Sequence, residues 1–141
     1  MDDHHPASEV QKWVLADGDN QLAEVRRWVQ RLLDDEVDGD TLGDVLLVVT
    51  ELVSNAYDHG RHALEVRLVP PLRHRRLVRV EVDDSSSELP VLGRSRIADT
   101  RGMGLVMVNA LCSSWGTSPL LVGKSVWADI VVPEQPGRPE G

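Results

Sequence analysis

Apolar side chains recur every three or four residues in two stretches of the first half of the chain. The first runs from Leu22 to Leu33 and the second from about Thr41 to Gly60, and this spacing is typical of an amphipathic helix. Residues 17–20 combine Asp, Gly and Asn and predict a turn with helix-capping side chains before the first helix. Gly60 stands where a left-handed cap would end the second helix.

Alternating apolar and polar residues predict strands in most of the remaining chain. The alternation is clearest over residues 77–83, where valines alternate with charged residues, and it is weaker over residues 62–69. Three further stretches are predicted as strands, at residues 12–16, 115–122 and 125–132, with Gly123-Lys124 as a tight turn between the last two. Gly102-Met103-Gly104 opens a third predicted helix that runs to Leu111.

The order of these elements is strand, helix, helix, strand, strand, helix, strand, strand. It lacks a regular strand–helix–strand alternation, so we predict an α+β fold with a mixed, mainly antiparallel sheet and helices on one face. The length of 141 residues is typical of a single domain. We expect this domain to span residues 10–133, between a disordered N-terminus (1–9) and a disordered Pro/Gly/Glu-rich tail (134–141). Residues 85–100 have no periodicity and are either a functional lid or disordered.

Composition and charge exclude several classes of function. The chain has 15 Lys+Arg against 23 Asp+Glu, a formal charge of −8, which argues against a general nucleic-acid or anionic-membrane binder. One cysteine, Cys112, excludes an internal disulfide and a multi-cysteine zinc site. No apolar run has the length of a membrane span and no signal-peptide pattern is visible. We therefore expect a reduced, cytoplasmic protein.

The polar side of the second predicted helix carries an unusual stripe. At about 100° per residue, Asp44, Glu51, Asn55 and Asp58 fall on one narrow line, and stacked acids repel unless water or a cation intervenes. A carboxylate one turn from an amide oxygen suits a hard cation such as Mg²⁺, and Glu51 can also serve as a general base. The alternative is the ordinary solvated face of an amphipathic helix.

Two other positions offer chemistry. The alternation of residues 77–83 places Asp84 on the apolar side as the strand ends, where a charge is costly without a partner; the alternative is an ordinary strand-end turn. Gly102 and Gly104 allow a phosphate to approach the backbone at a helix N-terminus, and Arg101 adds positive charge. A lone Gly-x-Gly is also common in simple turns.

These segments resemble the motifs of one family. Glu51-Leu-Val-Ser-Asn55-Ala-Tyr-Asp-His-Gly60 resembles the N-box of the GHKL ATPases, and most of all that of the small anti-sigma-factor serine/threonine kinases of bacteria. Asp84-Ser-Ser86-Ser-Glu-Leu-Pro90 is similar to their G1 box, although most GHKL members have glycines where this chain has serines. Residues 102–104 are similar to the G2 box. The resemblance covers roughly residues 10–133 and implies the two-layer α/β sandwich called the Bergerat fold.

The resemblance also implies a ligand and a set of roles. ATP with Mg²⁺ would be bound, with Asn55 as the metal ligand, Glu51 as the catalytic base or water-orienting group, and Asp84 accepting a hydrogen bond from the adenine amine. Such a carboxylate rejects the carbonyl of guanine. The further nucleotide-binding residues implied are Ser86, Arg101, Gly102, Met103, Gly104 and, from the penultimate strand, Ser125.

The leading hypothesis is a regulatory kinase. By resemblance it transfers the γ-phosphate of ATP to a Ser or Thr of an anti-sigma antagonist and also sequesters a sigma factor, and the resemblance allows for a homodimer. The alternatives are a non-catalytic module in which bound ATP or ADP gates a protein partner, and a scaffold that binds no nucleotide. A metal-dependent hydrolase using the acidic stripe lacks a second cluster of ligands.

Overall fold

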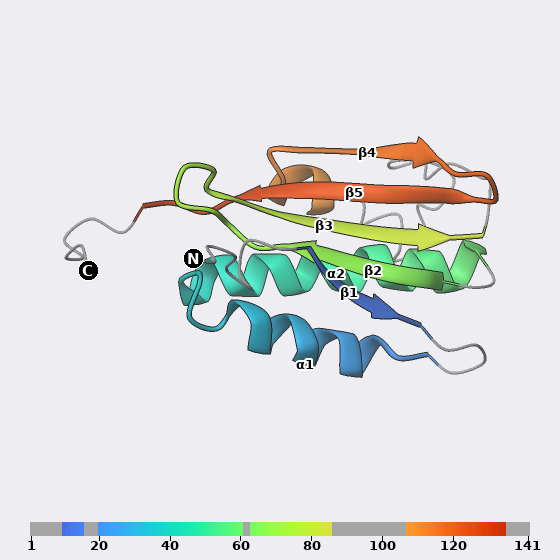
Figure 1. Cartoon of the computed structure of the whole chain (residues 1–141), viewed down its shortest axis with the longest axis horizontal. Coiled ribbons are helices and arrows are strands. Elements are labelled where there is room, and N and C mark those ends of the chain that lie inside the picture. The colour runs from blue at the N-terminus through green and yellow to red at the C-terminus, as the bar shows by residue number, and fades with distance from the viewer. Residues whose placement is uncertain (1–9, 16–19, 61–62, 86–106, 135–141) are drawn as a thin grey trace, which may run out of the picture.

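A five-stranded antiparallel sheet with helices on one face forms the body of the molecule (Figure 1). The computed structural model describes residues 10–15, 20–60, 63–85 and 107–134. The elements in chain order are β1 (Gln11–Val14), α1 (Leu22–Leu33), α2 (Gly39–Gly60), β2 (Ala63–Val69), β3 (Leu77–Asp84), β4 (Ser114–Pro119) and β5 (Lys124–Val131). Residues 107–111 are also helical and belong to the helix predicted for 102–111.

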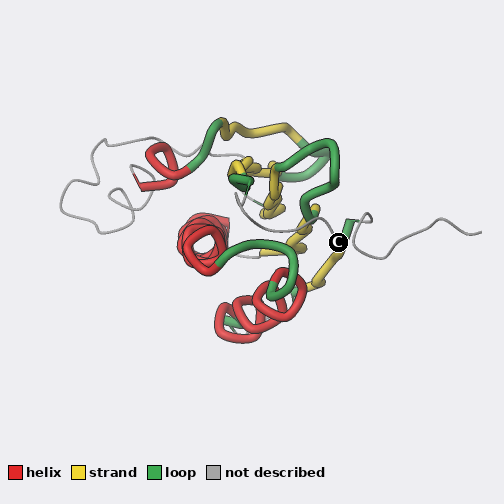
Figure 2. The backbone as a smooth tube through the Cα atoms, turned by 90° about the vertical axis from the view of Figure 1, so that its left-hand side faces the viewer, coloured by secondary structure: helices red, strands yellow, loops and turns green. Residues whose placement is uncertain are grey.

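The strand order is β1-β2-β3-β5-β4, and all four pairings between these strands are antiparallel. α1 and α2 lie on the same side of the sheet (Figure 2). The predicted α+β sandwich, with a mainly antiparallel sheet and helices on one face, is therefore confirmed. No helix in the described part of the chain is long and apolar enough to cross a membrane.

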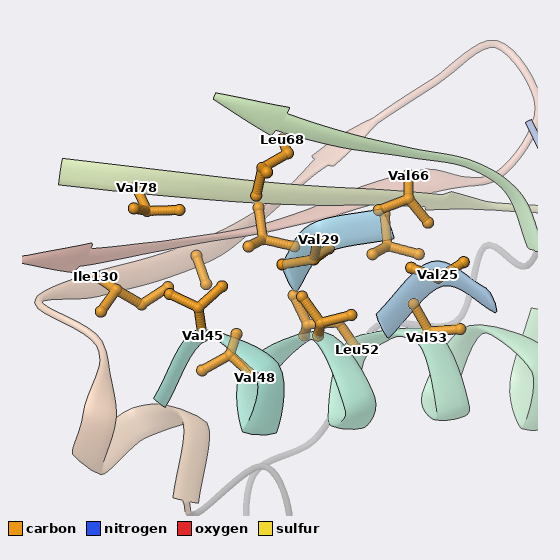
Figure 3. Close-up of a cluster of buried hydrophobic side chains, with 14 of the residues drawn as sticks. Val25, Val29, Val45, Val48, Leu52, Val53, Val66, Leu68, Val78 and Ile130 are labelled. Atoms are coloured by element: carbon orange, nitrogen blue, oxygen red, sulfur yellow. The ribbon is translucent and has the colours of Figure 1, made fainter. Parts of the chain in front are cut away.

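The core lies between α2 and the central strands. In β3 every second residue is buried, so that Val78, Val80 and Val82 face the helices while the residues between them face the other way. Figure 3 shows Val78 of β3 and Val66 of β2 on the side of the sheet that faces the buried side of α2. The larger apolar side chains of α2 that are fully or almost fully buried there are Val45, Val48, Val49, Leu52 and Val53. Burying each such side chain stabilises the fold by about 1.5–3 kcal/mol.

Polar contacts fix where the helices begin and how they pack. Asp38 caps α2: its carboxylate accepts hydrogen bonds from the Thr41 amide at 3.1 Å and the Thr41 hydroxyl at 2.6 Å. The cap explains why α2 begins two residues before the predicted start. Arg26 of α1 donates to the carbonyl of Leu46 at 3.2 Å and to the hydroxyl of Thr50, which ties the two helices together.

The turn between β4 and β5 differs from its prediction. The amide of Leu120 donates to the carbonyl of Gly123 at 3.0 Å, and Gly123 has φ +86°, which favours glycine. Lys124, expected in the turn, is instead the first residue of β5. β4 ends at Pro119, three residues before its predicted end, because this turn takes up residues 120–123.

Candidate functional site

The end of β3, the start of β5 and the last turns of α2 lie at the same end of the molecule (Figure 1). β3 and β5 pair so that Asp84, the last residue of β3, stands opposite Lys124, the first residue of β5. α2 packs against both strands. This end of the sheet therefore collects the predicted residues of α2 and β3 from two layers of the fold.

Asp84 is buried and forms an ion pair with Lys124. Its Oδ1 accepts a hydrogen bond from Lys124 Nζ at 3.0 Å, and the two side chains are only 3% and 6% exposed. The prediction that Asp84 stands on the apolar side of β3 is confirmed. Sequence reasoning missed its partner because it placed Lys124 in the turn. The signal available in the sequence was the apolar series Val126, Ala128 and Ile130 at every second position of β5, because Lys124 is in step with it.

Asn55 has an atom that lacks a partner. Its Nδ2 is buried without a hydrogen bond, and among the described residues only Trp13 Nε1 shares this state. An unmade hydrogen bond in the interior costs about 1–3 kcal/mol, and a buried N–H donor of this kind indicates a site that an acceptor, from water, an anion or a ligand, completes. Glu51 lies one helical turn earlier and is half-buried like Asn55, so the predicted pairing of these two positions on one face of α2 agrees with their exposure.

The residues at this position fit Mg²⁺ only together with another ligand. Asn55 and Glu51 carry oxygen donors of the kind that Mg²⁺ prefers, and Mg²⁺ usually keeps waters and phosphate oxygens besides one or two protein ligands. Within the described ranges, no group of three or more His, Cys, Asp or Glu side chains could hold a metal ion. The donor set therefore suits a cation that arrives with a phosphate group rather than one held by the protein alone.

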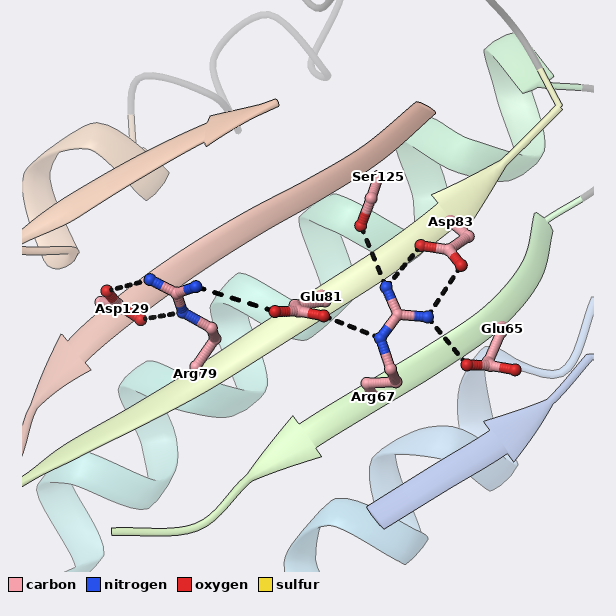
Figure 4. A network of polar contacts seen from close by, with 7 residues as sticks. All are labelled: Glu65, Arg67, Arg79, Glu81, Asp83, Ser125 and Asp129. Carbon is pink, nitrogen blue, oxygen red and sulfur yellow. Dashed lines mark hydrogen bonds and ion pairs between the residues drawn. The ribbon is translucent and has the colours of Figure 1, made fainter. Parts of the chain in front are cut away.

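Ser125 lies on the opposite face of the sheet from Asp84. Its hydroxyl accepts a hydrogen bond from Arg67 Nη2 at 3.2 Å (Figure 4). Neighbouring residues of a strand point to opposite faces, so Lys124 shares the helix-covered face with Asp84 and Ser125 does not. The structure therefore does not bring Ser125 to the other predicted site residues, and the phosphate contact that the resemblance implied for it is not supported.

An ion-pair network covers the sheet face opposite α1 and α2 (Figure 4). Arg67 is hydrogen-bonded to Glu81 at 2.7 Å, to Glu65 at 2.8 Å and to both oxygens of Asp83 at 2.8 and 2.7 Å. Burial opposes ionisation of Asp83, but hydrogen bonds from Arg67 and Ser125 outweigh it and lower the pKa of this carboxyl. The hydrogen bond with Asp83 likewise raises the pKa of Arg67.

A second arginine continues this network along the sheet. Arg79 binds both carboxylate oxygens of Asp129, at 2.7 and 2.9 Å, and its guanidinium carbon lies 4.5 Å from the ring centre of Trp127. Of the predicted site residues that the structure describes, Ser125 alone belongs to this face. Sequence reasoning did not find the network, although the charged residues that alternate with valines in β3 were a signal of it.

A family model described as the histidine kinase-like ATPase domain matches residues 15–119. The chain belongs to this family. The match includes α2 and β3, and so Glu51, Asn55 and Asp84 lie within the ATPase domain. The resemblance drawn from the sequence motifs is confirmed at the level of the family.

A solved structure supports the fold of this ATPase domain. The crystal structure of the RsbU and RsbW domains of Rv1364c from Mycobacterium tuberculosis is similar, with a TM-score of 0.64 and 20% sequence identity. The similarity covers 88% of this chain and 32% of that chain, so the ATPase domain corresponds to only part of that protein. At this identity the likeness shows the fold alone. No curated protein matches the sequence.

Part of the predicted site lies outside the described residues of the ATPase domain. These positions are Ser86, Arg101, Gly102, Met103 and Gly104, which belong to the predicted connection and to the start of the third helix. The structure consequently describes the parts of the site contributed by α2, β3 and β5. The roles implied for the five other residues stay predictions.

Proposed function

We propose that the chain binds ATP with Mg²⁺ and transfers the γ-phosphate to a Ser or Thr of a protein partner. The observation that carries the proposal is the buried, unpartnered amide nitrogen of Asn55 within a match to the histidine kinase-like ATPase family. An orphaned N–H donor one turn from a glutamate is what a missing acceptor, such as a phosphate oxygen, would leave behind. The family assignment supports ATP as the nucleotide.

Each described residue has a distinct role in this proposal. Asn55 would contribute an amide oxygen to Mg²⁺, which neutralises phosphate charge when bound. Glu51 would accept the proton of the attacking hydroxyl or orient it, while Asp84 would accept hydrogen bonds from the base. Phosphoryl transfer needs chiefly positioning and charge neutralisation rather than covalent chemistry by the protein, so a small set of side chains is sufficient.

The proposed partner class rests on the sequence motifs and on the solved structure that contains an RsbW domain. We propose that the phosphate acceptor is a small anti-sigma antagonist and that the chain also binds a sigma factor. The formal charge of −8 suits a partner with a basic or locally complementary surface. The proposed compartment is the cytoplasm, where both ATP and such partners would be met.

A transfer assay with radiolabelled ATP tests the catalytic part. The full chain, incubated with Mg²⁺ and a small anti-sigma antagonist, should label a Ser or Thr of that protein. Glu51→Gln should lower the transfer rate by about 10²–10⁴-fold, the usual contribution of a general base, while retaining nucleotide affinity. Glu24→Gln is the matched control, because Glu24 is an exposed glutamate of α1.

Titration calorimetry with ATP and ADP separates the alternatives. Nucleotide binding without transfer to any antagonist would favour a module whose bound nucleotide gates a protein contact. The serines in place of the G1-box glycines give this second function its support. Failure to bind either nucleotide in the presence of Mg²⁺ would overturn the proposal as a whole.

A further inference from the structure

The turn between β4 and β5 is apolar and exposed, whereas connecting turns are usually polar. Leu120, Leu121 and Val122 are 39%, 105% and 68% exposed. Among the described residues, no other three consecutive large apolar side chains are all exposed. Exposed apolar side chains gathered in this way lower solubility and are typical of a contact with another molecule. We call residues 120–122 the apolar tip.

The apolar tip belongs to a long stretch without charge. Residues 102–123 contain no Asp, Glu, Lys or Arg, although these residues make up 27% of the chain. Burial does not explain the lack of charge, because Met107, Ser114 and Ser118 in the described part of this stretch are exposed. An exposed surface without charge favours an apolar contact, since a charge of the partner buried against it would lose its hydration and gain no counter-ion.

The apolar tip is fixed at the end of the sheet where the candidate site lies (Figure 1). The amide of Leu120 donates to the carbonyl of Gly123 at 3.0 Å and closes the turn. A Cβ on Gly123 would collide with the carbonyl oxygen of Asp84, so the turn runs directly against the end of β3. The Cα of Leu121, two residues from Gly123, lies at most about 7.6 Å from that of Gly123. A side chain held in place in this way loses less conformational entropy on binding than a mobile one.

We propose that the apolar tip anchors the phosphate-accepting protein by entering an apolar pocket on its surface. This inference rests on the proposed function, because it names where that partner docks. The acceptor hydroxyl must reach the γ-phosphate near Glu51 and Asn55, in the last turns of α2, and the tip lies at this same end of the molecule (Figure 1). A docking contact beside Asp84, the proposed contact of the base, leaves the phosphate end of the nucleotide open to the acceptor.

Size and charge argue against the other occupants of the apolar tip. A stable interface buries about 800 Å² on each side, from roughly 20–30 residues, so the tip alone does not hold two copies of the chain together. Stable binding to an anionic membrane needs basic residues beside the apolar ones, whereas the chain has a formal charge of −8 and no charged residue between 102 and 123. An acceptor protein that also contacts other parts of this end of the molecule fits both observations.

The transfer of radiolabelled phosphate from ATP to a small anti-sigma antagonist, measured at varied antagonist concentration, tests the proposal. The full chain with both Leu121→Ser and Val122→Ser should show a KM for the antagonist raised at least about tenfold, as for loss of an interface hot spot. Its kcat and its dissociation constant for ATP should stay at the wild-type values. Leu121→Met, which keeps an apolar side chain, should retain the wild-type KM. Val131→Ser is the matched control, because Val131 is 53% exposed at the other end of β5.

The outcomes separate this inference from the proposed function. Transfer by the wild type with an unchanged KM in the double variant would overturn the inference and leave the function standing. An equal rise of KM in Val131→Ser would do the same. A fall in kcat or in ATP affinity without a rise in KM would assign the tip to the nucleotide site and would overturn docking. Absence of transfer by the wild type would overturn the function and the inference together.

Two further measurements on the same proteins test the other occupants. A dimer seen by light scattering in the wild type and lost in the double variant would assign the apolar tip to a second copy of the chain. Cosedimentation with vesicles of phosphatidylcholine and phosphatidylglycerol, lost in the double variant, would assign it to a membrane. Either result would overturn the inference. Leu121→Ser alone, at a fully exposed side chain, decides the matter where the double variant does not fold.

Discussion

Among the residues that the structure describes, Arg67 has the largest set of charged partners. It is 19% exposed and joins Glu65, Glu81 and Asp83 across two strands. Three carboxylates this close together repel one another without the guanidinium. Its planar set of donors reaches all three at once, which an ammonium cannot do with the same geometry.

Arg67→Met should therefore destabilise the fold by about 2 kcal/mol, less than the loss of a fully buried ion pair because the site is partly open to water. Urea unfolding measures this cost, with the exposed Arg31→Met of α1 as a control expected to change little. A loss no larger than in Arg31→Met would contradict the role assigned to the network.

The same variant should respond to pH in a defined direction. The folded-state pKa of Asp83 lies below its ordinary value of 3.8, so its contribution to stability is present above about pH 4 and is lost as the pH falls through the lower, folded-state pKa. The difference in stability between wild type and Arg67→Met should consequently shrink on going from pH 7 toward pH 3.

At the scale of the element, the start of α2 depends on a single side chain. Asp38 accepts two hydrogen bonds from Thr41, chiefly the one from the hydroxyl, and these lower the pKa of its carboxyl. Asp38→Ala should cost about 1 kcal/mol of unfolding free energy at pH 7.

The pH dependence of this cap follows from the sign of the shift. Because the folded-state pKa of Asp38 is lower than 3.8, the charged cap stabilises the helix above that pH and loses its advantage as the pH falls through the folded-state pKa. Asp38→Asn should retain most of the cap without this titration. Equal urea midpoints for Asp38→Ala and wild type at pH 7 would contradict the assignment.

Substituting alanine for two different glycines should change the stability of the fold in opposite directions. Gly123 has φ +86° and no room for a Cβ beside Asp84, so Gly123→Ala should destabilise the fold by several times the usual ~1 kcal/mol of a point substitution. Gly43 lies inside α2 with nothing within 4 Å of an added Cβ, and Gly43→Ala should stabilise it by roughly 0.5–1 kcal/mol. Thermal unfolding of both variants checks the contrast; shifts of the same sign would refute it.

At the scale of the whole molecule, nucleotide binding should raise the free energy of unfolding. A ligand that binds only the folded state adds about 2.7 kcal/mol at a hundredfold excess over its dissociation constant, which corresponds to a rise in Tm on the order of 5–10 °C for a domain of this size. Scanning calorimetry with ATP, with and without Mg²⁺, measures it. Asn55→Ala should reduce the part of the shift that depends on Mg²⁺, and an unchanged Tm in wild type would argue against a nucleotide site.

The fold was predictable because its signals are local. The alternation in β3 and the helical spacing in α2 can each be recognised within a short stretch of the chain. The predicted starts of α1 and α2 consequently lie within two residues of the observed ones. The faces of β5 were not predictable in the same way. Whether Lys124 or Ser125 faces the helices depends on where the turn ends, and one residue of difference reverses every side chain of a strand.

The Arg67 network and the partner of Asp84 could not be predicted from the sequence, because both depend on which strands are neighbours in the sheet. They require β3 to lie between β2 and β5, an order that no spacing within the sequence specifies. Asn55 and Asp84 could be singled out as candidates because an amide on an acidic stripe and an acid on an apolar face are unusual within their own elements. Lys124 looked ordinary beside a glycine, and its ion pair with Asp84 became visible only once β3 and β5 were paired.

The strand order also determines which backbone groups are left open at the margins of the sheet. β1 and β4 are the outermost strands, and they have only 4 and 6 residues. An open edge invites another chain to add a strand, and shortness together with proline discourages this; β4 ends at Pro119, which has no amide hydrogen to offer. Both edge strands are therefore poor templates for the addition of a further strand, which disfavours edge-to-edge aggregation of the domain.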